Sequence, residues 1–109
     1  MGHTQDSLQL VSLYNSMHGP NWIISTNWLS DLPISEWYGI TVHDSTVTAI
    51  ELPRNHLSGQ LPEDISQLSN LEILNLSNNN ISGELPVSLK NSVKLKSLDL
   101  SHNQIGGNL

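Results

Sequence analysis

The sequence predicts an α/β solenoid, in which short strands stack into a parallel sheet behind an N-terminal cap. From position 47 onward, the 109-residue chain repeats itself every 24 residues. Within each repeat, apolar and polar residues alternate over a few positions, which is typical of a short strand with one buried face. Residues 1–46 break the period and contain all three tryptophans. The length predicts a single domain.

The repeats align without gaps as residues 47–70, 71–94 and the partial unit 95–109. Each unit carries a strand-like triplet, IEL, LNL or LDL, close to its start. A strand this short is not stable alone, so units must stack about 4.8 Å apart to pair their strands. We therefore expect a parallel sheet in which each unit contacts only its neighbours.

An asparagine recurs just after each strand, at Asn55, Asn79 and Asn103. The chain turns there and its backbone groups lose their strand partners, yet buried backbone groups must be hydrogen-bonded. A side-chain amide both donates and accepts, so it can bridge the turns of successive units. We expect these three residues to face inward as a structural ladder. Asn78 and Asn80, on either side of Asn79, are expected to be solvated turn residues.

Residues 1–46 are expected to form the cap, beginning with a helix over residues 5–18. Thr4 is the expected N-cap and Gly19-Pro20 the stop signal. The apolar residues at helical spacing, which we expect on one stripe, are Leu8, Val11, Tyr14 and Met17.

The cap continues with a tryptophan-rich segment and a hairpin. Trp22, Trp28 and Trp37 are expected to cover the open edge of the first unit. The hairpin, with His43-Asp44-Ser45 as its turn, leads into the first repeat strand.

The pattern LxxLxLxxNxLxGxLPxxL over residues 47–109 resembles the leucine-rich repeats of the plant-specific type. The resemblance implies a right-handed superhelix with its parallel sheet on the concave side, and a second short strand around LSGQLP and ISGELP. The family mostly binds proteins, peptides or small ligands on the sheet side. Ser92 departs from the pattern, because the preceding unit has Leu68 there.

The cap also resembles that of plant-type members, which often carry a CxWxGVxC element. Here the element reads SEWYGITV, in which Trp37 and Gly39 match while Ser35 and Val42 replace the two cysteines. The usual cap disulfide is therefore impossible. The cap is similar to cysteine-free caps of bacterial and protist members.

The strand register predicts which residues lie on the concave face. They form one row of Glu51, Asn75 and Asp99, another of Arg54, Asn78 and His102, with Ile73 beside them. Such polar rows suit a protein- or peptide-binding groove, although any soluble sheet face also shows them. The leading interpretation is a non-enzymatic recognition domain, expected to be a fragment of a larger receptor-like or secreted protein. A spacer module without a ligand, or an ice- or carbohydrate-binding surface, remain alternatives.

Composition excludes several other functions. A net charge of −6 with only four Lys and Arg speaks against nucleic acid as a partner, and no apolar run is long enough for membrane insertion. No motif indicates a catalytic residue, a metal site or a cofactor. The absence of cysteine and of a signal peptide leaves a cytoplasmic location open, whereas the resemblance favours the cell surface. The sequons at Asn75 and Asn80 follow from the repeat pattern itself.

The third unit keeps the ordinary internal pattern, so its outer side is not specialised to face water. An unpaired strand edge and exposed apolar residues favour pairing with another chain. We therefore expect end-to-end self-association through residues 95–109, most simply as a homodimer, or fraying of residues ~100–109 if the chain stays monomeric.

Overall fold

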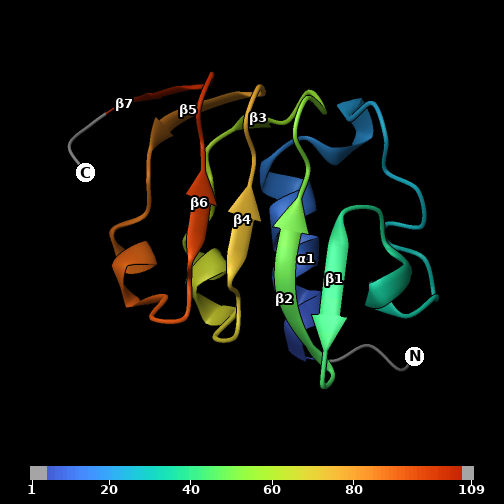
Figure 1. Ribbon diagram of the computed structural model, residues 1–109. Helices are drawn as coiled ribbons and strands as arrows, with labels where there is room; N and C mark the ends of the chain where they lie inside the picture. Colours follow the sequence, from blue (N-terminus) through green and yellow to red (C-terminus); the bar gives the residue numbers. More distant parts are fainter. Residues whose placement is uncertain (1–4, 107–109) are drawn as a thin grey trace.

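The computed structural model describes residues 5–106, which form stacked coils preceded by a helix and a hairpin (Figure 1). Helix α1 spans Gln5–Ser16. The strands are β1 (Ile40–His43), β2 (Thr46–Glu51), β3 (Ser58–Gly59), β4 (Ile73–Asn75), β5 (Asn80–Glu84), β6 (Ser97–Asp99) and β7 (Gln104–Gly106). Short 3-10 helices cover Gly19–Asn21, Ile34–Glu36, Glu63–Gln67 and Val87–Asn91.

The main sheet has the order β1-β2-β4-β6. Strands β2, β4 and β6 are parallel, and residues 24 apart in the sequence stand side by side in them. Strand β1 pairs antiparallel with β2, which makes β2 both the second strand of the hairpin and the first repeat strand. The 24-residue period therefore sets the register of the sheet directly.

A second, smaller sheet, β3-β5-β7, is built from the segment that follows each asparagine turn. From this sheet the chain returns to the next main strand through a 3-10 helix, Glu63–Gln67 in the first coil and Val87–Asn91 in the second. Figure 1 shows α1 and the helix Glu63–Gln67 behind the main sheet, with the helix Val87–Asn91 (orange) beside β6. The face of β2, β4 and β6 turned away from α1 is called the open sheet face below.

The buried side of the helical segment agrees only in part with the expected stripe. Met17, just after α1, is fully buried as expected, and Val11 and Tyr14 are partly buried against the core. Leu8, however, is 61% exposed, whereas Leu10 and Leu13 are fully buried. The stripe at i, i+3 and i+7 has the same helical period as the expected one, so periodicity alone did not distinguish them. The residue proposed as N-cap, Thr4, lies outside the described residues.

Two turn assignments also need correction. His43 is the last residue of β1 and pairs with Thr46, so the hairpin turn consists of Asp44 and Ser45 alone, both with positive φ. Two central residues with positive φ match the twist of a two-residue hairpin loop. Asn80 is exposed, as expected, but it begins β5 instead of lying in a turn.

The core is continuous from the helix through the coils. Its largest fully buried side chains include Leu10 and Met17 from the helical segment and Ile50, Leu74 and Leu76 from the repeats. The tryptophans lie in this same cluster, with ring centroids 4.9 Å apart for Trp22 and Trp28 and 5.2 Å apart for Trp28 and Trp37. The N-terminal segment and the repeats therefore share one core.

Gly39 allows the N-terminal segment to approach the first coil closely. Its φ is +83°, and a Cβ at this position would lie 2.5 Å from the carbonyl oxygen of Glu51. The Glu51 amide donates a hydrogen bond to the Gly39 carbonyl at 2.8 Å. Only glycine fits both the left-handed conformation and this contact.

Candidate functional site

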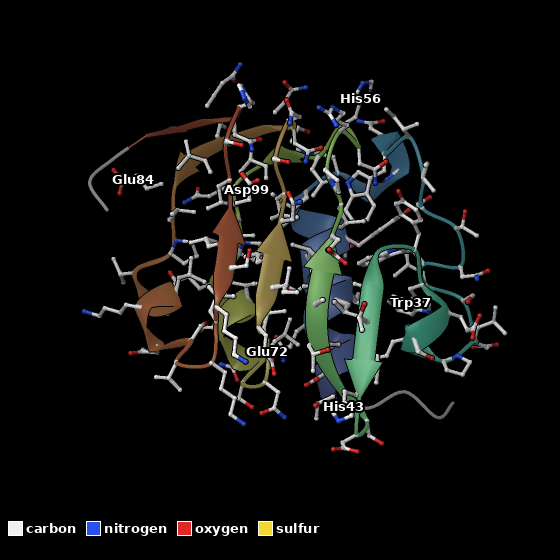
Figure 2. All side chains as sticks on the ribbon, viewed as in Figure 1. Trp37, His43, His56, Glu72, Glu84 and Asp99 are labelled. Carbon is white, nitrogen blue, oxygen red and sulfur yellow. The ribbon has the colours of Figure 1, made fainter. Side chains whose placement is uncertain are left out.

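The candidate recognition surface is the open sheet face and the turn at the ends of its strands. Glu51, Asn75 and Asp99 stand side by side at the last position of β2, β4 and β6. Ile73 precedes this row in the central strand β4 and is 37% exposed. Figure 2 labels Asp99 at the end of β6 and Glu72 just before the start of β4.

Three further residues expected at the site lie in the turns that follow the strands. Arg54 and His102 are exposed and Asn78 is half-buried. All three have positive φ, between 51° and 58°. Their amides also extend the coil-to-coil bonding, because Arg54 donates to Ser77 and Asn78 to Ser101. The backbone here is therefore fixed by stacking, while the side chain varies from coil to coil.

The residues of the row Glu51, Asn75 and Asp99 differ in the hydrogen bonds that their side chains make. The Asn75 side-chain oxygen accepts a hydrogen bond from the Ser77 amide at 3.1 Å, and the Asp99 carboxylate accepts one from the Ser101 amide at the same distance. In the first coil, Pro53 occupies the position equivalent to Ser77 and Ser101, and it has no N–H to donate. Glu51 is exposed.

The Asp99 carboxylate is further stabilised by the Ser101 hydroxyl, which donates to it at 2.7 Å. This hydrogen bond and the one from the Ser101 amide lower the pKa of Asp99 below its ordinary value. Asp99 consequently keeps its negative charge into mildly acidic solution.

The asparagines of the repeats lie beneath the turns, on the inner side. Asn79 is buried, its side-chain oxygen accepts from the amides of Asn55 and Leu57, and its NH₂ group donates to three carbonyls, including that of Leu52. Asn103 repeats part of this pattern towards Ile81 and Leu76. Asn79 and Asn103 therefore each satisfy backbone groups of the coil before them.

Asn55 has no preceding coil, and its side chain bonds instead to the tryptophan-rich segment. It accepts from the Ile24 amide and donates to the Ile24 carbonyl, each at 2.8 Å. Nearby, the indole nitrogens of Trp22 and Trp28 donate to the carbonyls of Met17 and Tyr38. Trp22, Trp28 and Trp37 are all buried, Trp37 the most completely.

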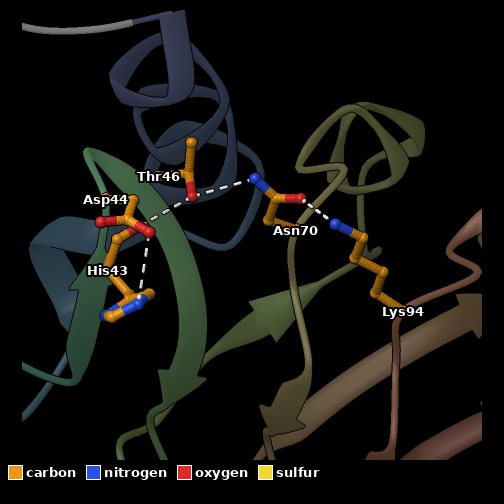
Figure 3. Close-up of polar contacts among 5 residues, drawn as sticks. All are labelled: His43, Asp44, Thr46, Asn70 and Lys94. Atoms are coloured by element: carbon orange, nitrogen blue, oxygen red, sulfur yellow. Dashed lines mark hydrogen bonds and ion pairs between the residues drawn. The ribbon is translucent and has the colours of Figure 1, made fainter.

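A polar network at the other ends of the strands was missed by the sequence reasoning (Figure 3). The Asn70 amide donates to the Thr46 hydroxyl at 3.0 Å, and Lys94 donates to the Asn70 oxygen at 2.8 Å. Two residues further along each coil, Glu72 and Lys96 form an ion pair of 3.7 Å. Thr46, Asn70 and Lys94 recur at the 24-residue period near the start of each strand, so the period itself was the signal that could have found them.

This network borders a polar hollow of about 190 Å³ beside the hairpin turn. Its lining mixes both charges with hydroxyl and amide groups, from His43, Asp44, Thr46, Thr48, Asn70, Glu72 and Lys94. The hydrogen bonds between its lining residues hold the coils in register.

A larger, apolar cavity of about 370 Å³ lies at the third coil, among Leu85, Pro86, Val87, Leu89, Lys90, Leu95 and Leu98. Leu98 is 46% exposed, although Ile50 and Leu74 at the same register are fully buried. Ser92 lies at the end of the second coil, and its hydroxyl is buried without a hydrogen-bond partner among the described residues. The stack is therefore packed less completely around the junction of the second and third coils than in the first coil.

Within residues 5–106, no three histidine, aspartate or glutamate side chains gather closely enough to hold a metal ion. The one α-helix in this range is also too short and too polar to cross a membrane.

The geometry agrees with what comparison with known proteins shows. The chain is 35% identical over 71 residues to the leucine-rich repeat receptor protein kinase EMS1 of Arabidopsis thaliana, a match covering 65% of this chain and 6% of the relative. The BIR2 ectodomain of the same plant superposes with a TM-score of 0.87 at 28% identity, over 99% of this chain and 60% of that one.

A further similar structure is the Arabidopsis receptor kinase HAESA ectodomain, solved in complex with an IDA peptide hormone ligand. It matches with a TM-score of 0.78 and 28% identity, over 93% of this chain and 17% of that one. The chain thus spans only a small part of the curated receptor kinase it matches. The leucine-rich repeat family model matches residues 45–105, and the chain belongs to the leucine-rich repeat family.

Proposed function

We propose that this chain is a non-enzymatic recognition domain that binds a protein or peptide on its open sheet face, within a larger receptor-like or secreted protein. The observation that carries the proposal is Ile73, a large apolar side chain exposed on the central strand and flanked by polar rows. An apolar centre with a polar rim is the usual composition of a recognition surface. The peptide bound by the HAESA ectodomain supports the same class of ligand.

The backbone of this face suits recognition because stacking holds it in place. The amides of Leu52 and Leu76 donate to the carbonyls of Asn75 and Asp99 in the next coil. Side chains on such a rigid scaffold lose little conformational freedom when a ligand binds.

We assign residues 1–46 as the N-terminal cap and residues 47–109 as the repeats, with right-handed winding of the coils. The bonds between Asn55 and Ile24 support the cap assignment, because the Ile24 backbone takes the place that a preceding coil would fill. The tryptophan cluster supports it as well, since it closes the apolar edge of the first coil.

The test is selection of peptides from a random display library on the immobilised protein, followed by titration calorimetry of the selected peptides. Ile73→Arg should abolish binding, because it places a charge at the centre of the surface. Leu8→Arg is the matched control, because Leu8 is exposed on α1 behind the sheet. A spacer module would select no peptide, and binding that survives Ile73→Arg would place the ligand elsewhere.

We also propose that two copies associate end to end through residues 95–109 when the protein is concentrated; residues 107–109 lie outside the described part. The exposed Leu98, the apolar cavity and the edge strand β6 support this proposal. A two-fold arrangement would pair both β6 edges at once. Sedimentation velocity should show dimers in the wild type and monomers for Leu98→Lys, and a strictly monomeric wild type would contradict the proposal.

A further inference from the structure

The row of Glu51, Asn75 and Asp99 at the strand ends contains two carboxylates, and these two differ in their hydrogen bonding. Asn75 and Asp99 each use a side-chain oxygen to accept the amide of the serine two residues later. Pro53 removes that amide from the first coil, so Glu51 cannot make the same bond. No hydrogen bond or ion pair engages the Glu51 side chain within residues 5–106. Among the described residues, Glu51 is thus the one member of the row whose side chain makes no hydrogen bond or ion pair.

No ion pair within residues 5–106 compensates the charge of Glu51. Residues 1–53 contain no lysine or arginine, and the protein as a whole has a net charge of −6. The first basic residue, Arg54, lies beyond Pro53 in the turn, and no ion pair joins it to Glu51. The remaining basic residues, Lys90, Lys94 and Lys96, follow in the last part of the chain. The field at Glu51 therefore favours a cation.

An apolar surface lies next to this carboxylate. Glu51 stands beside Asn75, and Ile73 is two residues earlier in the same neighbouring strand. Diagonal neighbours of this kind are within reach of long side chains. Lysine and arginine combine an apolar stem with a charged end, so either could cover Ile73 while its charge meets Glu51.

We propose that Glu51 is a specificity-determining residue that pairs with a basic side chain of the bound peptide, while the stem of that side chain packs on Ile73. This inference rests on the proposed function of the open sheet face. Arginine fits better than lysine, because its guanidinium can donate two parallel hydrogen bonds to one carboxylate.

The experiment compares peptide selection on three proteins: wild type, Glu51→Gln and Asp99→Asn. Both substitutions remove one negative charge from the same row without changing side-chain size. Peptides selected on the wild type should be enriched in arginine and lysine at one position. The enrichment should disappear on Glu51→Gln and persist on Asp99→Asn, and unchanged urea midpoints would show that each variant is folded.

Calorimetry on one selected peptide then measures the pair directly. Glu51→Gln should weaken its binding about fivefold, the upper range for an exposed ion pair. At least the same loss should follow when the basic residue of the peptide is replaced by glutamine, which removes the charge and also part of the stem on Ile73. On this substituted peptide Glu51→Gln should cost nothing further, because the ion pair is already absent.

The outcomes separate this inference from the function on which it rests. Selected peptides without basic enrichment, or with enrichment that survives Glu51→Gln, would overturn the role of Glu51 and leave peptide recognition standing. Enrichment lost equally on Asp99→Asn would also overturn it, because the effect would then depend on overall charge. A wild type that selects no peptide would overturn the proposed function and this inference with it.

Discussion

The two ends of the solenoid are built from similar sequence but differ in how they are covered. At the N-terminal end, the tryptophan cluster packs beside the first coil and Ile50 is fully buried. At the other end, Leu98 occupies the same register as Ile50 yet is 46% exposed beside an apolar cavity. In a repeat protein, the burial of a residue thus depends on the neighbouring coil as much as on its own unit.

The comparison predicts that the covered end is far more sensitive to truncation of a side chain. Trp37→Ala should destabilise the protein by about 3–5 kcal/mol, because the ring is 2% exposed and packs against Trp28. Leu98→Ala should cost only about 1 kcal/mol, because roughly half of its surface is already in water. Urea denaturation followed by circular dichroism measures both.

Similar losses for the two variants would mean that the third coil is covered in solution, and the contrast between the ends would be lost. Self-association of the wild type would produce this result at high protein concentration. The measurement is therefore made with Leu98→Ala at several concentrations, since only an associated end makes its stability concentration-dependent.

The second prediction concerns the asparagine ladder inside the covered coils. Asn79→Ala should cost about 1–3 kcal/mol, because it leaves the buried backbone groups of Asn55 and Leu57 without an acceptor. Asn80→Ala is the control, since Asn80 is exposed, and should change stability by less than about 0.5 kcal/mol. Equal midpoint shifts in urea would be incompatible with the structural role of Asn79.

Much of this fold follows from the 24-residue period alone. The period determines the register, so the partners Glu51, Asn75 and Asp99 could be read from the sequence. The same period relates Thr46, Asn70 and Lys94, so the sequence also carries the signal for the polar network at the other ends of the strands.

What the sequence could not predict depends on contacts outside the repeat. The helix offered two apolar stripes of the same period, and only packing against the coils selects Leu10 and Leu13 over Leu8. Glu51 likewise differs from Asn75 in its hydrogen bonding. The Asn75 side chain accepts a hydrogen bond from the Ser77 amide, whereas the first coil has Pro53 at the position equivalent to Ser77. The strand register predicts where each residue lies, but not which side chains form hydrogen bonds within the protein.

The third prediction concerns a packing defect at the end of the second coil. Ser92 is buried there with no hydrogen-bond partner for its hydroxyl among residues 5–106, at the position where the first coil has Leu68. Ser92→Ala should therefore stabilise the protein, by about 1 kcal/mol. Ser88→Ala, which removes a hydroxyl that donates to the Glu63 carbonyl, should instead be neutral or slightly destabilising. The calorimetric melting temperature of Ser92→Ala should therefore rise, while that of Ser88→Ala should stay the same or fall slightly, and a lower value for Ser92→Ala would contradict the assignment.

The smallest expected effect is the pH dependence contributed by Asp99. Its pKa is lowered in the folded protein, first by the Ser101 hydroxyl and then by the Ser101 amide. A lowered folded-state pKa contributes stability that is present above the unfolded pKa, near pH 4, and is lost as the pH falls through the folded value. The wild type should therefore be slightly more stable than Asp99→Asn at pH 7, with the difference vanishing at lower pH. Ser101→Ala should reduce this pH dependence, because it removes the larger cause and keeps the backbone bond. Denaturation between pH 2 and 7 measures the difference, and a gap between wild type and Asp99→Asn that is constant over this range would show that the charge of Asp99 is not responsible.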